Sequence, residues 1–239
     1  MSLSNKITNW LKLRVKKANS KGLVIGLSGG VDSAVVSVLA QKAFKNNILS
    51  IIIPCHSSEK DLKDARILAE KFNIKTKEVK IDSIYYELTK ILPDANRLAY
   101  ANLKPRLRML ILYYFANKLN YLVAGTGNKS ELTIGYFTKH GDGGVDLLPL
   151  GGLLKTEVWQ LAKELKIPAS IIKKAPSAGL WKGQTDENEM GITYKELDKA
   201  ITAIETGNYK GIEKSILSKV NKFIQCSAHK KSPIPIFKP

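Results

Sequence analysis

Residues 28–33, with the sequence SGGVDS, combine residue types that bind phosphate. Gly29 and Gly30 allow backbone conformations in which successive N–H groups point into one concavity, and the flanking serines add hydroxyl donors. The segment follows an apolar run and opens a helical pattern, so a helix N-terminus would add unpaired N–H groups and partial positive charge. It has neither the Gly-Lys-Ser/Thr ending of a Walker A loop nor the G-x-G-x-x-G spacing of a dinucleotide-binding loop. We therefore predict a phosphate-binding loop of another type, with a simple turn as the alternative.

Asp32 lies inside this loop and changes the ligand that the loop predicts. A carboxylate repels phosphate unless a cation separates them, and Mg²⁺ typically binds one or two carboxylates together with phosphate oxygens. Glu131, at the end of the stretch GTGNKSE, could give the second carboxylate. The sequence therefore predicts that Asp32 and Glu131 hold Mg²⁺ beside a polyphosphate. The alternatives are a first-turn acid that complements the helix dipole for Asp32 and a solvated helix residue for Glu131.

Bringing these distant residues together requires a scaffold with several strands. Continuous apolar runs predict strands that are buried on both faces, as in a parallel sheet covered by helices, and the more alternating run 76–81 predicts a strand nearer an edge. The buried strands are expected at residues 22–27, 48–53 and 121–126. Helices are expected at residues 32–44, 58–72, 96–120 and 156–165, after an amphipathic N-terminal helix, with Pro105 near a start or a kink.

The alternation of strands and helices predicts an α/β fold with an open, doubly wound parallel sheet flanked by helices, Rossmann-like in type. The later helical segments predict a helical C-terminal extension, and the simplest organisation is a single domain over residues 1–239. Ligands of such sheets gather at the carboxyl ends of the strands. Residues 28–33 and 125–131 both fall there.

The net charge of +17 raises the question of nucleic-acid binding. The basic residues are mostly scattered lysines without interleaved aromatic residues, which favours a solubilising surface that attracts small polyanions, and we expect no nucleic-acid partner. Cys55 and Cys226 give neither a disulfide framework nor a metal-ligand pair, as expected for a reducing cytoplasm. No apolar stretch has the length of a signal peptide core or a membrane span, so no membrane association is expected.

Several longer stretches carry a family resemblance. GLSGGVDSA is similar to the pyrophosphate-binding loop of the ATP pyrophosphatases, the PP-loop proteins with an adenine nucleotide alpha hydrolase-like fold. The resemblance narrows to ammonia-dependent NAD synthetases through further stretches in the order that the family has, from about residue 22 almost to the end. These stretches are NLKPRLRM, GTGNKSE, GYFTKHGDGGVDLLPLGGLLKTEVWQLA, IPASIIKKAPSAGLWKGQTDENEMGITYKELD and HKK.

This resemblance implies a ligase that forms a C–N bond in the final step of NAD biosynthesis. Such enzymes amidate deamido-NAD (nicotinic acid adenine dinucleotide) through an adenylated intermediate. They use Mg²⁺ as cofactor, ATP as co-substrate and ammonia as nitrogen donor, and they release NAD, AMP and pyrophosphate. The resemblance also implies a homodimer.

The resemblance further assigns expected roles to individual residues. The expected ATP-binding positions are Gly26, Leu27, Ser28, Gly29, Gly30, Val31, Asp32, Ser33, Thr126, Lys155 and Ser177. The positions expected to bind deamido-NAD are Arg106, Lys139, Asp146, His229 and Lys230. Lys155 and Lys182 are expected to neutralise phosphate charge. Asp142 is expected to attract ammonium and accept its proton, with loop shaping as its alternative role. Residues 177–190 are expected to form a lid that excludes water.

Two other functions agree with parts of the sequence. A tRNA-modifying ATP pyrophosphatase would share the loop and suit the charge of +17, but it would be expected to carry a basic appendage and often a reactive cysteine pair. A nucleotide sensor without catalysis would need a broken metal or substrate site, whereas Asp32, Glu131, Lys139 and Lys155 are all present.

Overall fold

The computed structural model describes residues 1–238, and its centre is a four-stranded sheet. The strands lie in the order β3-β2-β1-β4, and every pairing is parallel. Central strand β1 pairs through Val24 with Leu49 on one side and Val123 on the other. The strands are β1 (Gly22–Gly26), β2 (Ile48–Ile52), β3 (Thr76–Glu78) and β4 (Tyr121–Val123). The predicted open parallel sheet is confirmed.

Helices fill most of the remaining chain. The helices are α1 (Leu3–Lys17), α2 (Val31–Phe44), α3 (Glu59–Lys71), α4 (Asp82–Ile91), α5 (Arg97–Leu119), α6 (Lys129–Ile134), α7 (Lys155–Glu164), α8 (Ala169–Ile172), α9 (Asp186–Met190), α10 (Tyr194–Thr206), α11 (Lys214–Cys226) and α12 (Ala228–Lys231). Within residues 1–238 none of these helices is both long and apolar enough to cross a membrane.

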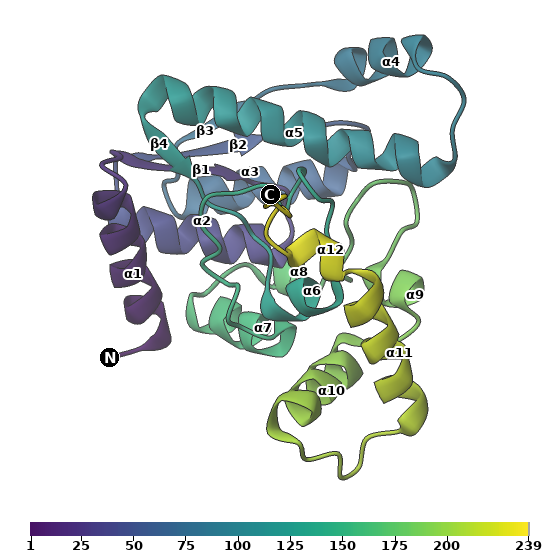
Figure 1. Cartoon of the computed structure of the whole chain (residues 1–239). Coiled ribbons are helices and arrows are strands. Elements are labelled where there is room, and N and C mark those ends of the chain that lie inside the picture. The colour runs from purple at the N-terminus through teal and green to yellow at the C-terminus, as the bar shows by residue number, and fades with distance from the viewer. Residues whose placement is uncertain (239) are drawn as a thin grey trace.

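The helices cover both faces of the sheet, as a doubly wound fold requires (Figure 1). α1, α2, α3 and α7 contribute to one apolar cluster with the sheet, whereas α4 and α5 border a second cluster on the opposite face. The chain runs outward from β1 through β2 to β3 and then returns through α5 to β4 on the other side of β1. The strand order therefore reverses between β1 and β4, where ligands of such sheets bind.

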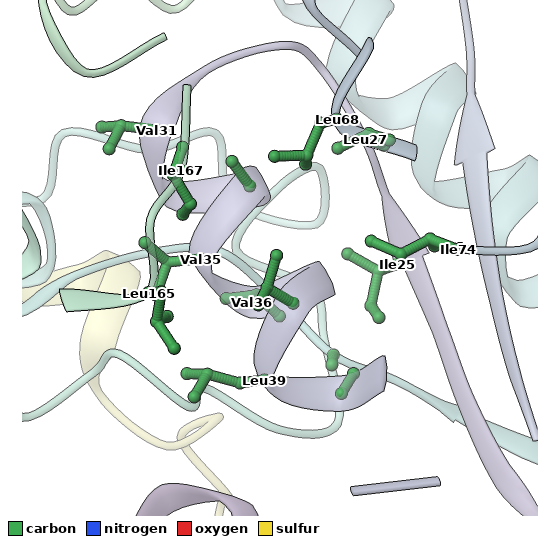
Figure 2. Packing of buried hydrophobic residues seen from close by; sticks show 14 of the residues in the cluster. Ile25, Leu27, Val31, Val35, Val36, Leu39, Leu68, Ile74, Leu165 and Ile167 are labelled. Carbon is green, nitrogen blue, oxygen red and sulfur yellow. The ribbon is translucent and has the colours of Figure 1, made fainter. Parts of the chain in front are cut away.

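Helix α2 lies in the middle of the first cluster and determines where the loop before it points. Its sequence VVSVLA is apolar nearly all round, and its side chains are buried between the sheet and helices α1 and α7. Figure 2 shows Val35 and Leu39 of α2 among the surrounding apolar side chains, with Ile25 of β1 nearby. Each large apolar side chain buried in this way stabilises the fold by about 1.5–3 kcal/mol. The start of α2 is thus fixed relative to the end of β1.

The C-terminal half builds a smaller helical layer, which confirms the predicted helical extension. α10 and α11 project from the lower part of the molecule in Figure 1. They pack on α6 through a third apolar cluster that includes Ile134, Tyr194, Leu197 and Val220. This cluster holds α6, which carries Glu131, against helices from the far end of the chain.

Three local expectations need correction. Pro105 lies well inside α5, so of its two expected placements the helix start is wrong and the kink stays a prediction. β4 ends at Val123, because the chain then leaves the sheet and forms only an isolated bridge from Ala124 to Leu147. The segment 177–190 is only partly a loop, since it ends in helix α9 with Asp186 and Met190 buried. The edge position of β3 is confirmed, as its residues are exposed.

Candidate active site

The segment 28–33 forms a tight loop directly after β1. Gly29 has a φ of +83°, and a Cβ atom on it would lie 2.2 Å from the carbonyl oxygen of Asp61, so only glycine fits there. The Ser33 hydroxyl donates to the Gly30 carbonyl oxygen at 2.9 Å and accepts from the Ser28 N–H at 3.2 Å. The serine hydroxyls thus shape the loop itself. Gly30 caps α2 without a side-chain hydrogen bond, which leaves N–H groups of the first turn for a ligand.

Three helices bring a lysine and two carboxylates together beside this loop. The Nζ atom of Lys155, at the start of α7, lies 2.5 Å from Oδ2 of Asp32 and 3.3 Å from Oε1 of Glu131. Asn128, the N-cap of α6, donates its Nδ2 hydrogen to Oδ1 of Asp32 at 2.9 Å. Residues separated by more than ninety positions therefore meet at one point. We name Asp32, Glu131 and Lys155 the carboxylate–lysine cluster.

The predicted metal ligands have the chemistry that Mg²⁺ requires. Carboxylate oxygens of Asp32 and Glu131 both reach one cationic atom, the Nζ of Lys155. Within residues 1–238 no group of three or more His, Cys, Asp or Glu side chains forms a metal site by itself. Two carboxylates are within the number that Mg²⁺ takes from a protein when phosphate and water oxygens complete its coordination.

A buried tyrosine and a further carboxylate lie next to the carboxylate–lysine cluster. Tyr194 is fully buried, and its hydroxyl lies 2.9 Å from Oδ2 of Asp186 and 3.3 Å from Oε1 of Glu131. Asp186 also accepts a hydrogen bond from the Tyr136 hydroxyl at 3.1 Å. The Lys155 ammonium lies 4.9 Å from the centre of the Tyr194 ring, within the range of a cation–π interaction.

Sequence reasoning gave Tyr194 and Tyr136 no role and placed Asp186 only in a lid. No short motif links a tyrosine to a carboxylate of another helix. The stretch DENEMGITY does contain Asp186 and Tyr194, but nothing in it predicts that both side chains are buried beside the carboxylate–lysine cluster.

The surroundings raise the pKa values of both Glu131 and Lys155, but for different reasons. Burial raises the pKa of Glu131 to about 7, with the Lys155 charge opposing this and the Asp32 and Asp186 charges adding to it. Burial alone would lower the pKa of Lys155, but the carboxylates of Asp32 and Glu131 outweigh it and raise that pKa. Lys155 therefore carries a fixed positive charge, while Glu131 shares a proton with solution near neutral pH.

The raised pKa of Glu131 predicts a specific pH dependence of stability in the metal-free protein. Between about pH 4.5 and about pH 7 the folded state keeps a proton on Glu131 that the unfolded chain has released. Rising pH in this window therefore destabilises the fold, at no more than about 1.4 kcal/mol per pH unit. Relative to a Glu131→Gln variant, wild-type protein should lose stability across this window.

Urea unfolding at pH 5 and pH 7 in the presence of EDTA measures this difference. A Glu164→Gln variant, which changes an exposed acid at the end of α7, is the control and should follow the wild-type profile. Parallel profiles for wild type and Glu131→Gln would contradict the prediction.

Four of the residues expected to bind deamido-NAD come together at the C-terminal end of the chain. Arg106 donates to the Lys139 carbonyl oxygen at 3.4 Å, and the Nζ atom of Lys139 donates to the His229 carbonyl oxygen at 2.9 Å. Lys230 lies next in sequence and donates to the Gly135 carbonyl oxygen at 2.8 Å. These contacts fasten α12 onto the loop that follows α6.

The other expected ligand residues have different surroundings. Asp146 accepts hydrogen bonds from the Tyr113 hydroxyl at 3.0 Å and the Val123 N–H at 2.8 Å, which places it beside α5 and β4. Thr126 follows β4 at the carboxyl edge of the sheet. Ser177 donates to the Gln184 carbonyl oxygen at 2.8 Å and so closes the loop that it begins.

Asp142 and Lys182, two of the expected catalytic residues, differ in how firmly they are held. One Asp142 oxygen accepts the Thr138 N–H at 3.0 Å, so this side chain does shape its loop. Asp142 keeps an exposed surface, yet the protein around its carboxyl group desolvates it and raises its pKa, with the Thr138 hydrogen bond opposing. Lys182 is exposed, and no hydrogen bond or ion pair within residues 1–238 involves its side chain, so the structure does not bring it to the carboxylate–lysine cluster.

The fold and this site together define a class. A doubly wound parallel sheet places an uncapped glycine loop and a carboxylate–lysine cluster at its switch point, which is the arrangement of a nucleotide-binding α/β protein. Within that class the family model described as NAD synthase matches residues 3–234. The chain belongs to the NAD synthase family.

Individual relatives agree with this membership. The chain is 58% identical over 200 residues to the NH3-dependent NAD(+) synthetase of Carboxydothermus hydrogenoformans, covering 82% of each chain. Among solved structures it is similar to an NMN synthetase from Francisella tularensis, with a TM-score of 0.91, 38% identity and coverage of 99% of this chain and 98% of the other. It is also similar to the NH3-dependent NAD synthetase of Campylobacter jejuni, with a TM-score of 0.87, 31% identity and full coverage of both chains.

Proposed function

We propose that this protein is an ammonia-dependent NAD synthetase, a ligase that amidates deamido-NAD at the expense of ATP. The proposal rests on one observation. The carboxylate–lysine cluster lies beside the glycine loop at the sheet's switch point, where the N-terminus of α2 has no side-chain cap. This arrangement suits a metal-bound triphosphate. The curated relatives named NH3-dependent NAD(+) synthetase support the choice of reaction.

In the first step a carboxylate oxygen of deamido-NAD attacks the α-phosphorus of ATP, the bond from that phosphorus to the β-phosphate oxygen breaks, and pyrophosphate leaves. Asp32 and Glu131 would hold Mg²⁺, which, when bound, draws charge from the phosphate oxygens. The N–H groups at the start of α2 would bind the leaving pyrophosphate. Lys155 contributes a fixed positive charge, because its pKa is raised.

In the second step the ammonia nitrogen attacks the adenylated carbonyl carbon, AMP leaves with the electron pair of the broken C–O bond, and the nitrogen loses a proton to solvent. Ammonium must first release a proton to give this nucleophile, and we assign attraction of ammonium and acceptance of that first proton to Asp142. Desolvation raises the pKa of its carboxyl group and so makes it a better base than an ordinary aspartate. Arg106, Lys139, Asp146, His229 and Lys230 would bind the dinucleotide, and closure of the loop that begins at Ser177 would exclude water from the adenylate.

A direct assay tests this function. Purified protein supplied with ATP, Mg²⁺, deamido-NAD and ammonium should form NAD, AMP and pyrophosphate in equal amounts. Formation of ADP in place of AMP would overturn the mechanism. Glutamine freed of ammonia should not replace ammonium. Tight, salt-sensitive tRNA binding without NAD formation would favour an RNA-modifying ATP pyrophosphatase instead.

A second candidate substrate for the amidation is suggested by the solved NMN synthetase of Francisella tularensis, which resembles the chain over nearly its whole length. The same chemistry on nicotinic acid mononucleotide would yield NMN. Comparing kcat/KM for the mononucleotide and the dinucleotide in one assay decides between them. We expect the dinucleotide to be preferred, because the curated relative with 58% identity is an NAD(+) synthetase.

We further propose that the protein is a homodimer in the cytoplasm. Helix α4 buries none of its own residues, and α4, its C-terminal end and the neighbouring α5 expose large apolar side chains. These exposed side chains are Ile84, Tyr86, Ile91, Leu92, Leu98, Leu110 and Tyr114. Apolar surface of this extent supports burial against a second copy. Both cysteines are free, as a reducing compartment would leave them.

Substituting one exposed apolar side chain of α5 tests the dimer. Leu110→Lys places a charge on a side chain that is 67% exposed, and it should convert the dimer to a monomer. Leu13→Lys on α1, at a side chain 61% exposed, is the matched control and should leave the dimer intact. Light scattering after size exclusion should give about twice the chain mass of 26.4 kDa for wild type. A monomeric wild type, or a Leu110→Lys variant that remains dimeric, would contradict the assignment.

A further inference from the structure

Lys174, on the segment after α8, contacts the backbone of the glycine loop at the carbonyl oxygen of Gly29. Its Nζ atom lies 2.9 Å from the carbonyl oxygen of Gly29, 2.7 Å from Oδ1 of Asp61 and 2.6 Å from Oδ2 of Asp64. Asp61 and Asp64 both belong to α3. One ammonium group therefore joins the loop after β1 to the first turns of a neighbouring helix.

The Lys174 contact is built into the interior. The Lys174 side chain is 17% exposed and that of Asp64 only 6%. Asp64 is also held by the Ser170 hydroxyl, which donates to Oδ1 at 3.0 Å, so its Oδ2 is left to form an ion pair with Lys174. Burying two charges costs desolvation that only good geometry and further hydrogen bonds offset. A contact of this kind constrains the groups that it joins.

Two of the three N–H donors of the Lys174 ammonium are committed to the protein. The Gly29 carbonyl oxygen and Oδ1 of Asp61 accept them, and Asp64 adds an ion pair at 2.6 Å. Lys174 therefore differs from Lys182, which is exposed. Its hydrogen bond to the Gly29 oxygen lets it act on a ligand of the glycine loop through the loop backbone.

Peptide geometry shows how that influence works. The Gly29 carbonyl and the Gly30 N–H belong to one planar trans peptide and point in opposite directions. Holding the Gly29 oxygen toward Lys174 therefore directs the Gly30 N–H to the other side of the loop, where it donates to the exposed Ser28 hydroxyl at 3.2 Å. The close approach of Gly29 to the Asp61 carbonyl oxygen leaves this peptide resting directly on α3.

We propose that Lys174 is a positioning residue for ATP, which fixes the glycine loop on α3 so that its N–H groups face the phosphates. The proposal rests on the proposed function to the extent that this loop binds a polyphosphate. Losing the ammonium would free the Gly29–Gly30 peptide to rotate. Phosphate binding would then have to restore the correct orientation at its own cost, which weakens ATP binding.

The test compares Lys174→Met with Lys173→Met. Methionine keeps most of the apolar stem and removes the charge, and Lys173 is exposed and adjacent in sequence. Lys174→Met should bind a non-hydrolysable ATP analogue with Mg²⁺ about tenfold more weakly. The KM for ATP should rise by a similar factor, while the KM for deamido-NAD should change less than about twofold. Lys173→Met should match wild type in all three.

A second variant separates positioning from simple charge neutralisation. Lys174→Met leaves the buried Asp64 carboxylate without a cation, whereas Lys174→Met with Asp64→Asn removes both charges and should recover thermal stability. If this double variant still binds the ATP analogue weakly, the positioning role is supported. If it recovers wild-type affinity, or if folded Lys174→Met binds like wild type, the proposal is overturned.

If Lys174→Met alone does not fold, ATP-analogue binding is measured on the double variant Lys174→Met with Asp64→Asn instead. A wild-type protein that binds the analogue but forms no NAD would overturn the proposed function alone. Analogue binding by the variants would still decide the role of Lys174.

Discussion

Replacing Lys155 by methionine is expected to lower kcat/KM for ATP by about 10²–10³-fold, the range found when one preorganised electrostatic group is lost from an active site. Lys155 is 2% exposed, and its ammonium balances Asp32 and Glu131 at close range. Without it, a triphosphate would approach Asp32 and Glu131 with no fixed positive charge from Lys155 beside them. Steady-state assays with saturating deamido-NAD and ammonium measure the effect.

The same substitution should change the remaining acids. With the ammonium gone, the pKa of Glu131 should rise further above about 7, since the Lys155 charge now opposes the effect of burial. Breaking a buried ion pair by removing one partner costs about 3–5 kcal/mol, so circular dichroism must first establish that the variant is folded.

Lys163→Met on the exposed side of the same helix is the control and should retain wild-type activity. A folded Lys155→Met variant with kcat/KM within tenfold of wild type would refute the role given to this residue.

The sequence could predict the site where local chemistry and sheet topology act together. SGGVDS has its own backbone requirement, and parallel strands place their carboxyl ends at one edge, so Asp32 and Glu131 could be expected to meet. The structure brings them within reach of one ammonium group. The helix boundaries followed from capping residues: Ser58 and Asn96 each accept an N–H three residues later, as N-caps do.

What the sequence could not predict depends on contacts between helices far apart in the chain. The Tyr194 hydroxyl meets Glu131 because α10 packs on α6, and it also contacts Asp186 of α9. Periodicity within one helix does not specify its partner helix. Lys174 is one of many lysines, and nothing in its neighbourhood in sequence distinguishes it from Lys173. Pro105 was expected near a helix start or a kink because proline lacks an N–H. The start is wrong, since α5 continues through Pro105 and packs against the sheet.

Asp198 illustrates the same limit and gives the largest expected effect on stability. It lies on α10 and is 4% exposed. One oxygen accepts the Ser130 hydroxyl at 2.5 Å, and the other accepts the N–H and the hydroxyl of Thr156 at 2.9 and 2.8 Å. Ser130 in turn accepts the Lys155 N–H at 2.9 Å. A single buried carboxylate thus joins the helix of Glu131 to the first turn of the helix of Lys155.

Asp198→Ala should therefore destabilise the protein by about 3–5 kcal/mol, because three charge-assisted hydrogen bonds are lost and buried donors remain unpaired. For a chain of this size that corresponds to a fall in Tm of roughly 6–20 °C. Asp198→Asn should cost less, since its one amide oxygen can still accept from Thr156 while the Ser130 contact changes. Differential scanning calorimetry and urea unfolding measure the three proteins side by side.

Glu205→Ala is the matched control on the same helix. It removes an acid that forms an ion pair with Lys129 at 2.7 Å. This pair lies at the surface, since Glu205 is 50% exposed. Exposed ion pairs contribute at most about 1 kcal/mol, so Glu205→Ala should shift Tm only slightly. Equal losses in Asp198→Ala and Glu205→Ala would mean that α10 contributes through its apolar face alone. The larger loss at Asp198 would instead establish that a buried carboxylate from the helical extension holds Glu131 and Lys155 in their relative positions.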